Sequence, residues 1–368
     1  MELDSFRKKE IFVIGIFISL IILFLFDFGW FIPLDGSISV GATPITGIPI
    51  LPTLLSFILL IPLYFWVYHR PHEGLKSYQS EDIKSIMKVF LLIFSIIMVF
   101  RTIILLRYGL PYEKTPMIFF IGLQIIFVEC YYLKNFGFHM NKIWKNILFT
   151  FILLLIVGIL LVGIFGSIIF GLLLFGMIDL NLLFQTPISI NWYGIASFPF
   201  QLICVGVSEE LFFRGYLYTK LRSSNLSYIR SILLSSIFFG LFHICWYISP
   251  TSPWFISDFE QIFYHVGYTF IFGVMMCIIF ERTRSLVAPL IIHGLANSLG
   301  SSISISNPFE FSFGGITFGG LSFGGLTPIA ELWLIGLATV AIIPIFFIFI
   351  IWILPRITKW IGVEANSF

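Results

Sequence analysis

The chain has 368 residues, of which 58% are hydrophobic and only 11% are charged, with 45 phenylalanines and a formal net charge of +2. A water-soluble domain of this size has to cover itself with a polar surface, so this composition excludes a soluble globular protein. The small net charge gives no indication of a nucleic-acid partner. We therefore expect an all-α, polytopic bundle of transmembrane helices that crosses a cell membrane several times.

A helix that spans a membrane needs about 20 mostly apolar residues. On that rule the sequence predicts ten spans, and the first is interpreted as a retained helix and not as a cleaved signal peptide. The predicted spans are 11–31, 50–68, 89–106, 117–133, 147–178, 193–218, 231–248, 262–280, 286–304 and 332–354. The fifth is long for one upright helix, and we count it as a single tilted span or a span that ends in an interfacial piece.

Basic residues lie before the first predicted span and after every even-numbered one. The odd-numbered connections are nearly free of them, with Arg107 and Lys114 as exceptions. Because Lys and Arg concentrate in cytoplasmic loops, this pattern predicts that both termini are cytoplasmic. Counting the fifth run as two spans would invert the second half of the chain and break the pattern.

By content the chain divides into three parts. Residues 1–192 hold membrane spans without diagnostic motifs, residues 193–304 form the candidate catalytic core, and residues 305–368 hold a Phe/Gly loop and the last span. The loop contains the repeat "FSFGGITFGGLSFGGLT" (311–327), interpreted as lying on the non-cytoplasmic lipid interface, with a substrate-gating lid as the alternative. The four cysteines lie in apolar runs without a CxxC pair, which indicates buried free thiols.

The stretch "GVSEELFFRGYLYTKL" places Glu209, Glu210 and Arg214 inside the sixth predicted span. Ionised side chains in hydrocarbon are costly and are seldom present without a use. Glu210 and Arg214 are four residues apart and share a helix face, whereas Glu209 points about 100° away and has no local partner. A purely structural ion network explains this motif by itself about as well as a functional site does.

Further polar side chains lie within other predicted spans. The seventh holds Phe239 and, one turn later, His243, and the ninth holds His293 and Asn297 on one face. Measured along ideal helices from the nearest basic boundary residue, Glu209, His243 and His293 lie at a depth of ~14–20 Å, near the middle of a hydrocarbon core about 30 Å thick. We therefore expect these side chains to converge in a polar cavity shielded from lipid.

A carboxylate beside an imidazole can activate water as a general base, and a second imidazole with an amide can stabilise an oxyanion. Water attack on an amide bond is the reaction class that fits this set. Alternatively, Glu209, His243 and His293 can ligate a divalent metal that activates the water, as in a metalloendopeptidase. The HExxH signature is absent and Asn is an unusual zinc ligand, so we favour metal-free chemistry without a cofactor.

Three motifs on three separate predicted helices, EExxxR, FxxxH and HxxxN, resemble the CAAX protease and bacteriocin-processing family. Its eukaryotic members are the type II CAAX prenyl endopeptidases, or Ras-converting enzymes. The motifs read "EELFFR" from Glu209, "FGLFH" from Phe239 and "HGLAN" from His293. The run "FGVMMCIIFERTRSLVAPLIIHGLANS" (272–298) is similar to the family's usual lead-in, with Gly, a short charged turn, Pro and then His. The resemblance covers roughly residues 193–304.

This resemblance implies an all-α membrane bundle whose site opens towards the cytoplasm and lipid. Glu209 would activate the water with help from His243. His293 and Asn297 would stabilise the oxyanion. Structural support would come from Glu210, Arg214 and Phe239. The implied partners are a membrane-associated peptide or protein substrate and the lipid bilayer.

Two other classes of protein stay open at this point. One is a non-catalytic membrane scaffold or immunity protein that only binds a peptide. The other is a transporter that uses the same buried polar residues. The sequence shows no inverted repeat of broken helices, although Asp27 and Arg101 are further charges within apolar runs.

Overall fold

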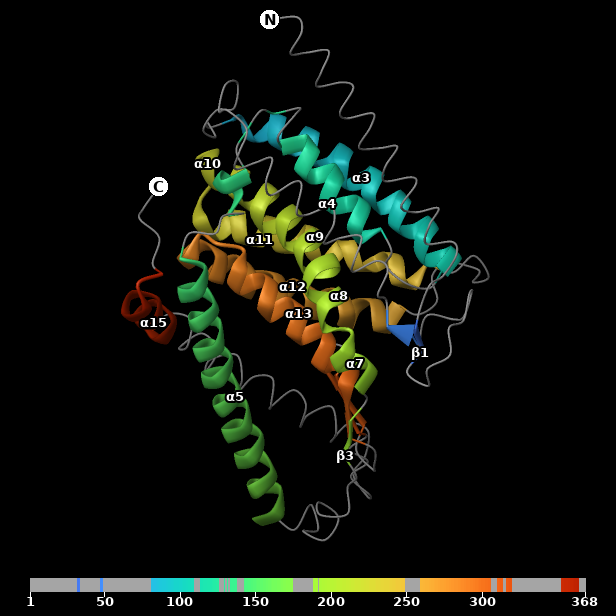
Figure 1. Cartoon of the computed structure of the whole chain (residues 1–368), viewed down its shortest axis with the longest axis vertical. Coiled ribbons are helices and arrows are strands. Elements are labelled where there is room, and N and C mark those ends of the chain that lie inside the picture. The colour runs from blue at the N-terminus through green and yellow to red at the C-terminus, as the bar shows by residue number, and fades with distance from the viewer. Residues whose placement is uncertain are drawn as a thin grey trace, which may run out of the picture. The chain divides into compact units, whose positions relative to one another are not determined.

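The structure is a computed structural model of the chain, shown in Figure 1. It describes residues 32–33, 47–48, 81–108, 113–125, 129, 131, 133–137, 142–174, 188–190, 192–248, 259–305, 310–313, 316–319 and 352–363. The predicted spans 11–31 and 50–68, and most of 332–354, lie outside the described residues.

The described chain is almost entirely helical. Its long helices are α3 (Ile83–Tyr108), α4 (Lys114–Leu123), α5 (Ile143–Leu174), α11 (Tyr228–Leu241), α12 (Phe259–Thr283) and α13 (Val287–Ser302). Shorter pieces are α7 (Trp192–Ala196), α8 (Phe198–Phe200), α9 (Val207–Glu210), α10 (Thr219–Ser223), α15 (Leu354–Ile361), the π-helices η4 (Gln201–Gly206) and η5 (Leu211–Tyr218), and the 3-10 helices η3 (Leu133–Phe136) and η6 (Phe242–Tyr247). Three antiparallel strand pairs complete it: β1 (Ile32–Pro33) with β2 (Gly47–Ile48), β3 (Ile188–Ile190) with β4 (Ile303–Ile305), and β5 (Glu310–Phe313) with β6 (Ile316–Gly319).

Five stretches within the described residues are long and apolar enough to cross a membrane. They are Ile83–Leu106, Ile143–Leu160, Gly194–Ser223, Tyr228–Tyr247 and His265–Thr283. Val287–Leu299 is a shorter apolar helix. The helical class is thereby confirmed and these candidate spans support a membrane protein, whereas the count of ten spans and the cytoplasmic termini stay predictions.

The fourth predicted span, 117–133, differs from expectation. The helix α4 ends at Leu123, and a separate 3-10 turn follows at Leu133–Phe136. Between them, the Tyr131 N–H donates to the Ile125 carbonyl, and the Glu129 carboxylate lies 2.6 Å from the Lys220 ammonium. The predicted apolar helix therefore ends early, and Glu129, within the predicted span, pairs with Lys220 of α10.

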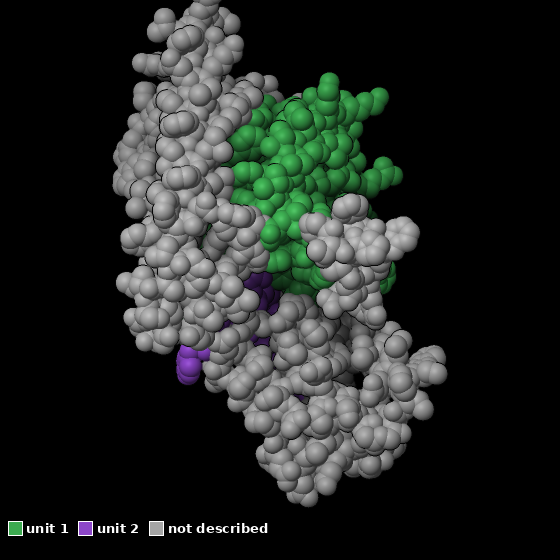
Figure 2. Space-filling model, turned by 90° about the vertical axis from the view of Figure 1, so that its right-hand side faces the viewer, with its two compact units in different colours: residues 1–141, 196–295 green, residues 142–195, 296–368 purple. Residues whose placement is uncertain are grey.

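The chain divides into two compact units, of which the first holds residues 1–141 and 196–295. Figure 2 shows the described part of this unit in green. Its interior is rich in phenylalanine: the Phe90 and Phe212 rings stack at 5.1 Å, and the Phe213 ring meets Phe239 edge-on at 5.2 Å. Small residues let α11 and α12 approach closely, because a Cβ atom on Gly273 would lie 3.1 Å from that of Ser236.

Within the sixth predicted span, helical structure runs almost without interruption from Trp192 to Ser223. It contains two π-helical segments, η4 and η5, which flank the four residues of α9. Each π turn takes up more residues than an α turn and so changes which side chains share a face. Such segments occur frequently at functional sites, and α9 carries Glu209 and Glu210.

The second unit holds residues 142–195 and 296–368. Its helix α5 is one continuous element of 32 residues, as the single-span interpretation predicted. The strands β3 and β4 pair in the register Ile188 with Ile305 and Ile190 with Ile303. Part of the predicted Phe/Gly loop is a hairpin, in which Phe311 lies opposite Phe318. Alternation of apolar with small or polar residues at period two explains this pairing.

The predicted free thiols agree with the structure where it describes them. Cys204, Cys245 and Cys277 are buried and take part in no disulfide. The side chain of Cys130 lies outside the described residues. The functional division into residues 1–192, 193–304 and 305–368 stays a prediction.

Candidate active site

The adjacent carboxylates of α9 face different partners. Both are buried, with Glu209 2% and Glu210 0% exposed. The Arg214 Nη1 atom lies 3.0 Å from Glu210 Oε1, which is the ion pair that the four-residue spacing predicted. The guanidinium of Arg214 also lies over the Phe239 ring, 4.1 Å from its centroid. Glu210 and Arg214 thus form a buried ion pair that joins α9 to η5.

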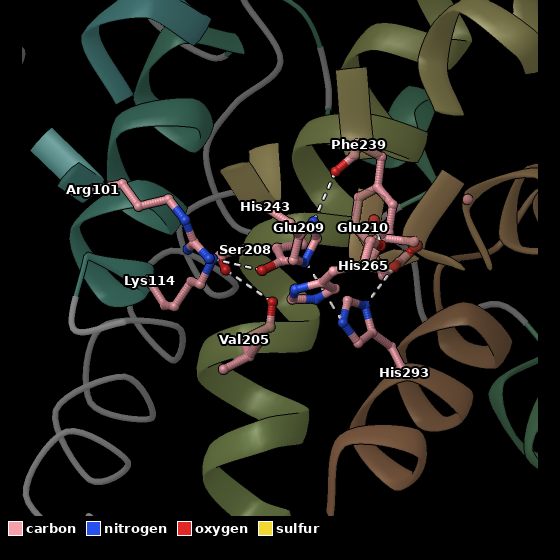
Figure 3. A network of polar contacts seen from close by, with 12 residues as sticks. Arg101, Lys114, Val205, Ser208, Glu209, Glu210, Phe239, His243, His265 and His293 are labelled. Carbon is pink, nitrogen blue, oxygen red and sulfur yellow. Dashed lines mark hydrogen bonds and ion pairs between the residues drawn. The ribbon is translucent and has the colours of Figure 1, made fainter. Parts of the chain in front are cut away.

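Glu209 points to the two histidines of the other motifs, as Figure 3 shows. Its Oε2 atom lies 3.9 Å from His243 Nε2 and 3.7 Å from His293 Nε2. Both imidazoles are buried, at 9% and 3% exposure. Their similar depths along the predicted helices indicated that these three side chains could converge. The structure brings them together.

Hydrogen bonds at Nδ1 fix the orientation of both rings. His243 Nδ1 lies 2.9 Å from the Phe239 carbonyl, and because a carbonyl only accepts, Nδ1 carries the proton. His293 Nδ1 lies 2.7 Å from Glu210 Oε1 and donates to that carboxylate. Both Nε2 atoms are thereby turned towards Glu209.

The Phe239 ring packs against both histidines. It meets His243 edge-on at 5.0 Å and His293 at 5.9 Å. Gly294, beside His293, brings α13 against η4, since a Cβ atom there would lie 2.9 Å from Leu202 Cα. Phe239 of the FxxxH motif and Gly294 of the HxxxN motif thus both contribute to close packing around the histidines.

Asn297 lies one helical turn beyond His293 on α13, in the second of the two units. Asn297 takes part in an interaction of its own. Its role at an oxyanion stays a prediction that the resemblance supplies.

The sequence prediction missed three charged residues at the site. Lys114 Nζ lies 2.6 Å from Glu209 Oε1 and 3.1 Å from Glu113 Oε1, and Arg101 donates in turn to Glu113. All three are at most 1% exposed. In the sequence, Lys114 was notable only as a basic residue in a predicted non-cytoplasmic connection. Arg101 was notable only as a charge within an apolar run.

A further histidine, His265 on α12, was also missed. Its ring centroid lies 5.2 Å from that of His243, and the Tyr247 hydroxyl lies 2.8 Å from its Nδ1 atom. Like His243, it is an imidazole side chain within an apolar predicted span, here 262–280, so the sequence carried the same indication for both residues.

The set Glu209, His243 and His293 fits a divalent metal poorly. One oxygen of the carboxylate already holds the ammonium of Lys114, which would repel a second cation at this distance. Among the residues that the structure describes, no group of three His, Cys, Asp or Glu side chains is arranged to hold a metal ion.

Apolar helices that enclose a carboxylate and two imidazoles define a membrane-embedded helical protein with a buried polar site. Residues 191–299 match the family model described as type II CAAX prenyl endopeptidase Rce1-like, which confirms the resemblance over this range. Comparisons with curated proteins and with solved structures found no match. The family supports a membrane endopeptidase and gives no support to metalloendopeptidase-like chemistry. The matched range contains Glu209, His243 and His293, while Arg101, Glu113 and Lys114 precede it.

Proposed function

We propose that the protein is an intramembrane endopeptidase that hydrolyses a peptide bond of a membrane-associated protein or peptide, with water activated by Glu209 and His243. The observation that carries this proposal is the spacing of three polar atoms. Glu209 Oε2 lies 3.7 Å and 3.9 Å from the two Nε2 atoms, which is too far for direct hydrogen bonds. A water oxygen about 2.8 Å from each atom would bridge them.

The first step is attack by this water on the peptide carbonyl carbon. Glu209 Oε2 accepts one proton of the water, and His243 Nε2 accepts a hydrogen bond from the other. The Nδ1–H of His243 stays on the Phe239 carbonyl throughout, so the ring keeps its orientation. The new C–O bond leaves a negative charge on the former carbonyl oxygen.

Stabilisation of that oxyanion is the role we propose for His293 and Asn297. With a proton on Nε2, His293 donates to the oxyanion, while its Nδ1–H bond to Glu210 holds the ring in place. The intermediate then collapses: the C–N bond breaks and its electron pair stays on nitrogen. The nitrogen takes the proton held by Glu209, which gives a carboxylic acid and an amine.

We further propose that the site opens towards the cytoplasm. The predicted charge pattern supports this side, because Arg230 and Arg284 lie at the ends of helices that carry site residues. A basic rim would attract a peptide that ends in a free carboxylate. The lipid bilayer is the second partner, and no nucleic acid is involved.

Cleavage by the purified protein in detergent tests the proposal. The probe is a fluorescence-quenched peptide that carries an S-farnesyl cysteine followed by three residues, with the same peptide lacking farnesyl as comparator. In cells, mass spectrometry of membrane peptides compares the wild type with Glu209→Ala. Peptide binding without cleavage would instead indicate a scaffold, and ion or substrate flux in liposomes would indicate a transporter.

A further inference from the structure

A buried cluster of charges adjoins the site but lies outside the matched domain. Arg101 of α3, Glu113 at the start of α4 and Lys114 of α4 are at most 1% exposed and form a chain of ion pairs that ends on Glu209. Figure 3 shows Arg101 and Lys114 beside Glu209. The carboxylate of Glu209 and the ammonium of Lys114 come from residues 95 positions apart in the sequence. Two separate parts of the chain therefore build the environment of the proposed base.

The charges of this cluster balance. A buried carboxylate is costly unless a cation or several donors compensate it. Glu113 and Glu209 contribute two negative charges, while Arg101 and Lys114 contribute two positive ones. Both cations also lie against the ring of Phe242, at 4.2 Å and 4.3 Å from its centroid. Phe242 precedes His243, so the cluster contacts the FxxxH motif directly.

The two oxygens of Glu209 have separate environments. Lys114 holds Oε1 at 2.6 Å, whereas Oε2 faces the two imidazoles. The terminal torsion of a glutamate is broad, so an unrestrained carboxylate would sample many orientations. A charged donor on one oxygen restricts that rotation and leaves the other directed at the histidines.

We propose that Lys114 is a positioning residue of this enzyme, which orients the carboxylate of Glu209 for water activation and is itself held by Glu113 and Arg101. This inference rests on the proposed peptidase function. Lys114 acts through Glu209 and contacts neither the water nor the substrate. The site of the enzyme therefore extends beyond the matched domain to α3 and α4.

Lys220 provides a matched control. It is also a buried lysine, 2% exposed, with its Nζ atom 2.6 Å from a carboxylate oxygen of Glu129. It lies on α10, where its ammonium also lies 3.4 Å from Glu81 and 4.8 Å from the centroid of the Tyr216 ring. Replacing it removes an equivalent buried ion pair without touching Glu209.

The experiment compares Lys114→Met with Lys220→Met as purified, folded proteins on the farnesylated peptide. Misplacement of a catalytic group lowers the rate about 100-fold, so Lys114→Met should lose that much kcat with KM nearly unchanged. Lys220→Met should keep kcat within about threefold of wild type. Propylamine, which can supply an ammonium, should restore part of the kcat of Lys114→Ala. Equal kcat values for the two Met variants would overturn the proposal.

A stability cycle separates this proposal from the proposed function. Lys114→Met leaves Glu209 buried without its cation, so its thermal unfolding temperature should fall, and adding Glu209→Gln should raise it again. A double variant no more stable than Lys114→Met would contradict the pairing. A wild-type protein that cleaves no peptide would overturn the proposed function, while recovery of stability in the double variant would still support the pairing.

Discussion

The Nδ1 atom of His293 lies 2.7 Å from Oε1 of Glu210, the immediate neighbour of the proposed base. The same oxygen accepts from Arg214 at 3.0 Å. One glutamate of the pair thus orients a histidine and neutralises an arginine, while the other faces the two Nε2 atoms. Adjacent and chemically identical side chains acquire different tasks because a helix turns them towards different neighbours.

Glu210→Gln tests this division of tasks. The amide oxygen can still accept from His293, but Arg214 loses its buried counter-charge. Removing one partner of a buried pair costs about 3–5 kcal/mol, so we expect a large loss of thermal stability and only a partial loss of cleavage rate. Glu209→Gln should lose less stability, because Lys114 keeps Glu113 as a counter-charge at 3.1 Å. Similar unfolding temperatures for the two variants would contradict this distinction.

Two glycines on neighbouring helices should respond oppositely to alanine. At Gly294 a Cβ atom would lie 2.9 Å from the Leu202 backbone, whereas at Gly267 it would meet nothing within 4 Å. Overpacking costs about 1–3 kcal/mol, so Gly294→Ala should be destabilised and should lose activity as His293 shifts. Gly267→Ala should be neutral or slightly stabilised. Thermal unfolding and cleavage assays check both, and equal effects would refute the packing argument.

Chelator should leave the activity unchanged. The ammonium of Lys114 already occupies one oxygen of Glu209, and this opposes a divalent cation. We expect no stoichiometric zinc by elemental analysis of the purified active protein. Activity that disappears with chelator and returns with one equivalent of zinc would show that Glu209, His243 and His293 are metal ligands.

The orientation can be tested with a single introduced thiol. Ser227 is exposed, between α10 and α11. In a background that lacks the four native cysteines, Ser227→Cys should react with a membrane-impermeant reagent in inside-out vesicles and not in intact cells. Labelling from outside intact cells would reverse the proposed substrate side.

The convergence of Glu209, His243 and His293 could be predicted from the sequence. Charged and imidazole side chains are conspicuous in apolar runs, and depth along a helix follows directly from residue count. The Glu210–Arg214 pair could be predicted for the same reason, since its geometry is local to one helix.

Lys114 and Arg101 could not be assigned to the site in this way. Their burial depends on pairing with residues far away in the sequence, which no helical period encodes. The end of α4 at Leu123 and the β5–β6 hairpin likewise depend on pairing and strand register and not on apolar run length. His265 had the same signal as His243 but lay outside any recognised motif.

The central claim is that Glu209 activates water to cleave a peptide bond. The most direct measurement is mass spectrometry of peptide products formed in water enriched in heavy oxygen, by the wild type and by Glu209→Gln. We predict that each new carboxyl group from the wild type carries one heavy oxygen and that the variant yields no product above buffer. Cleavage by Glu209→Gln at the wild-type rate would contradict the account.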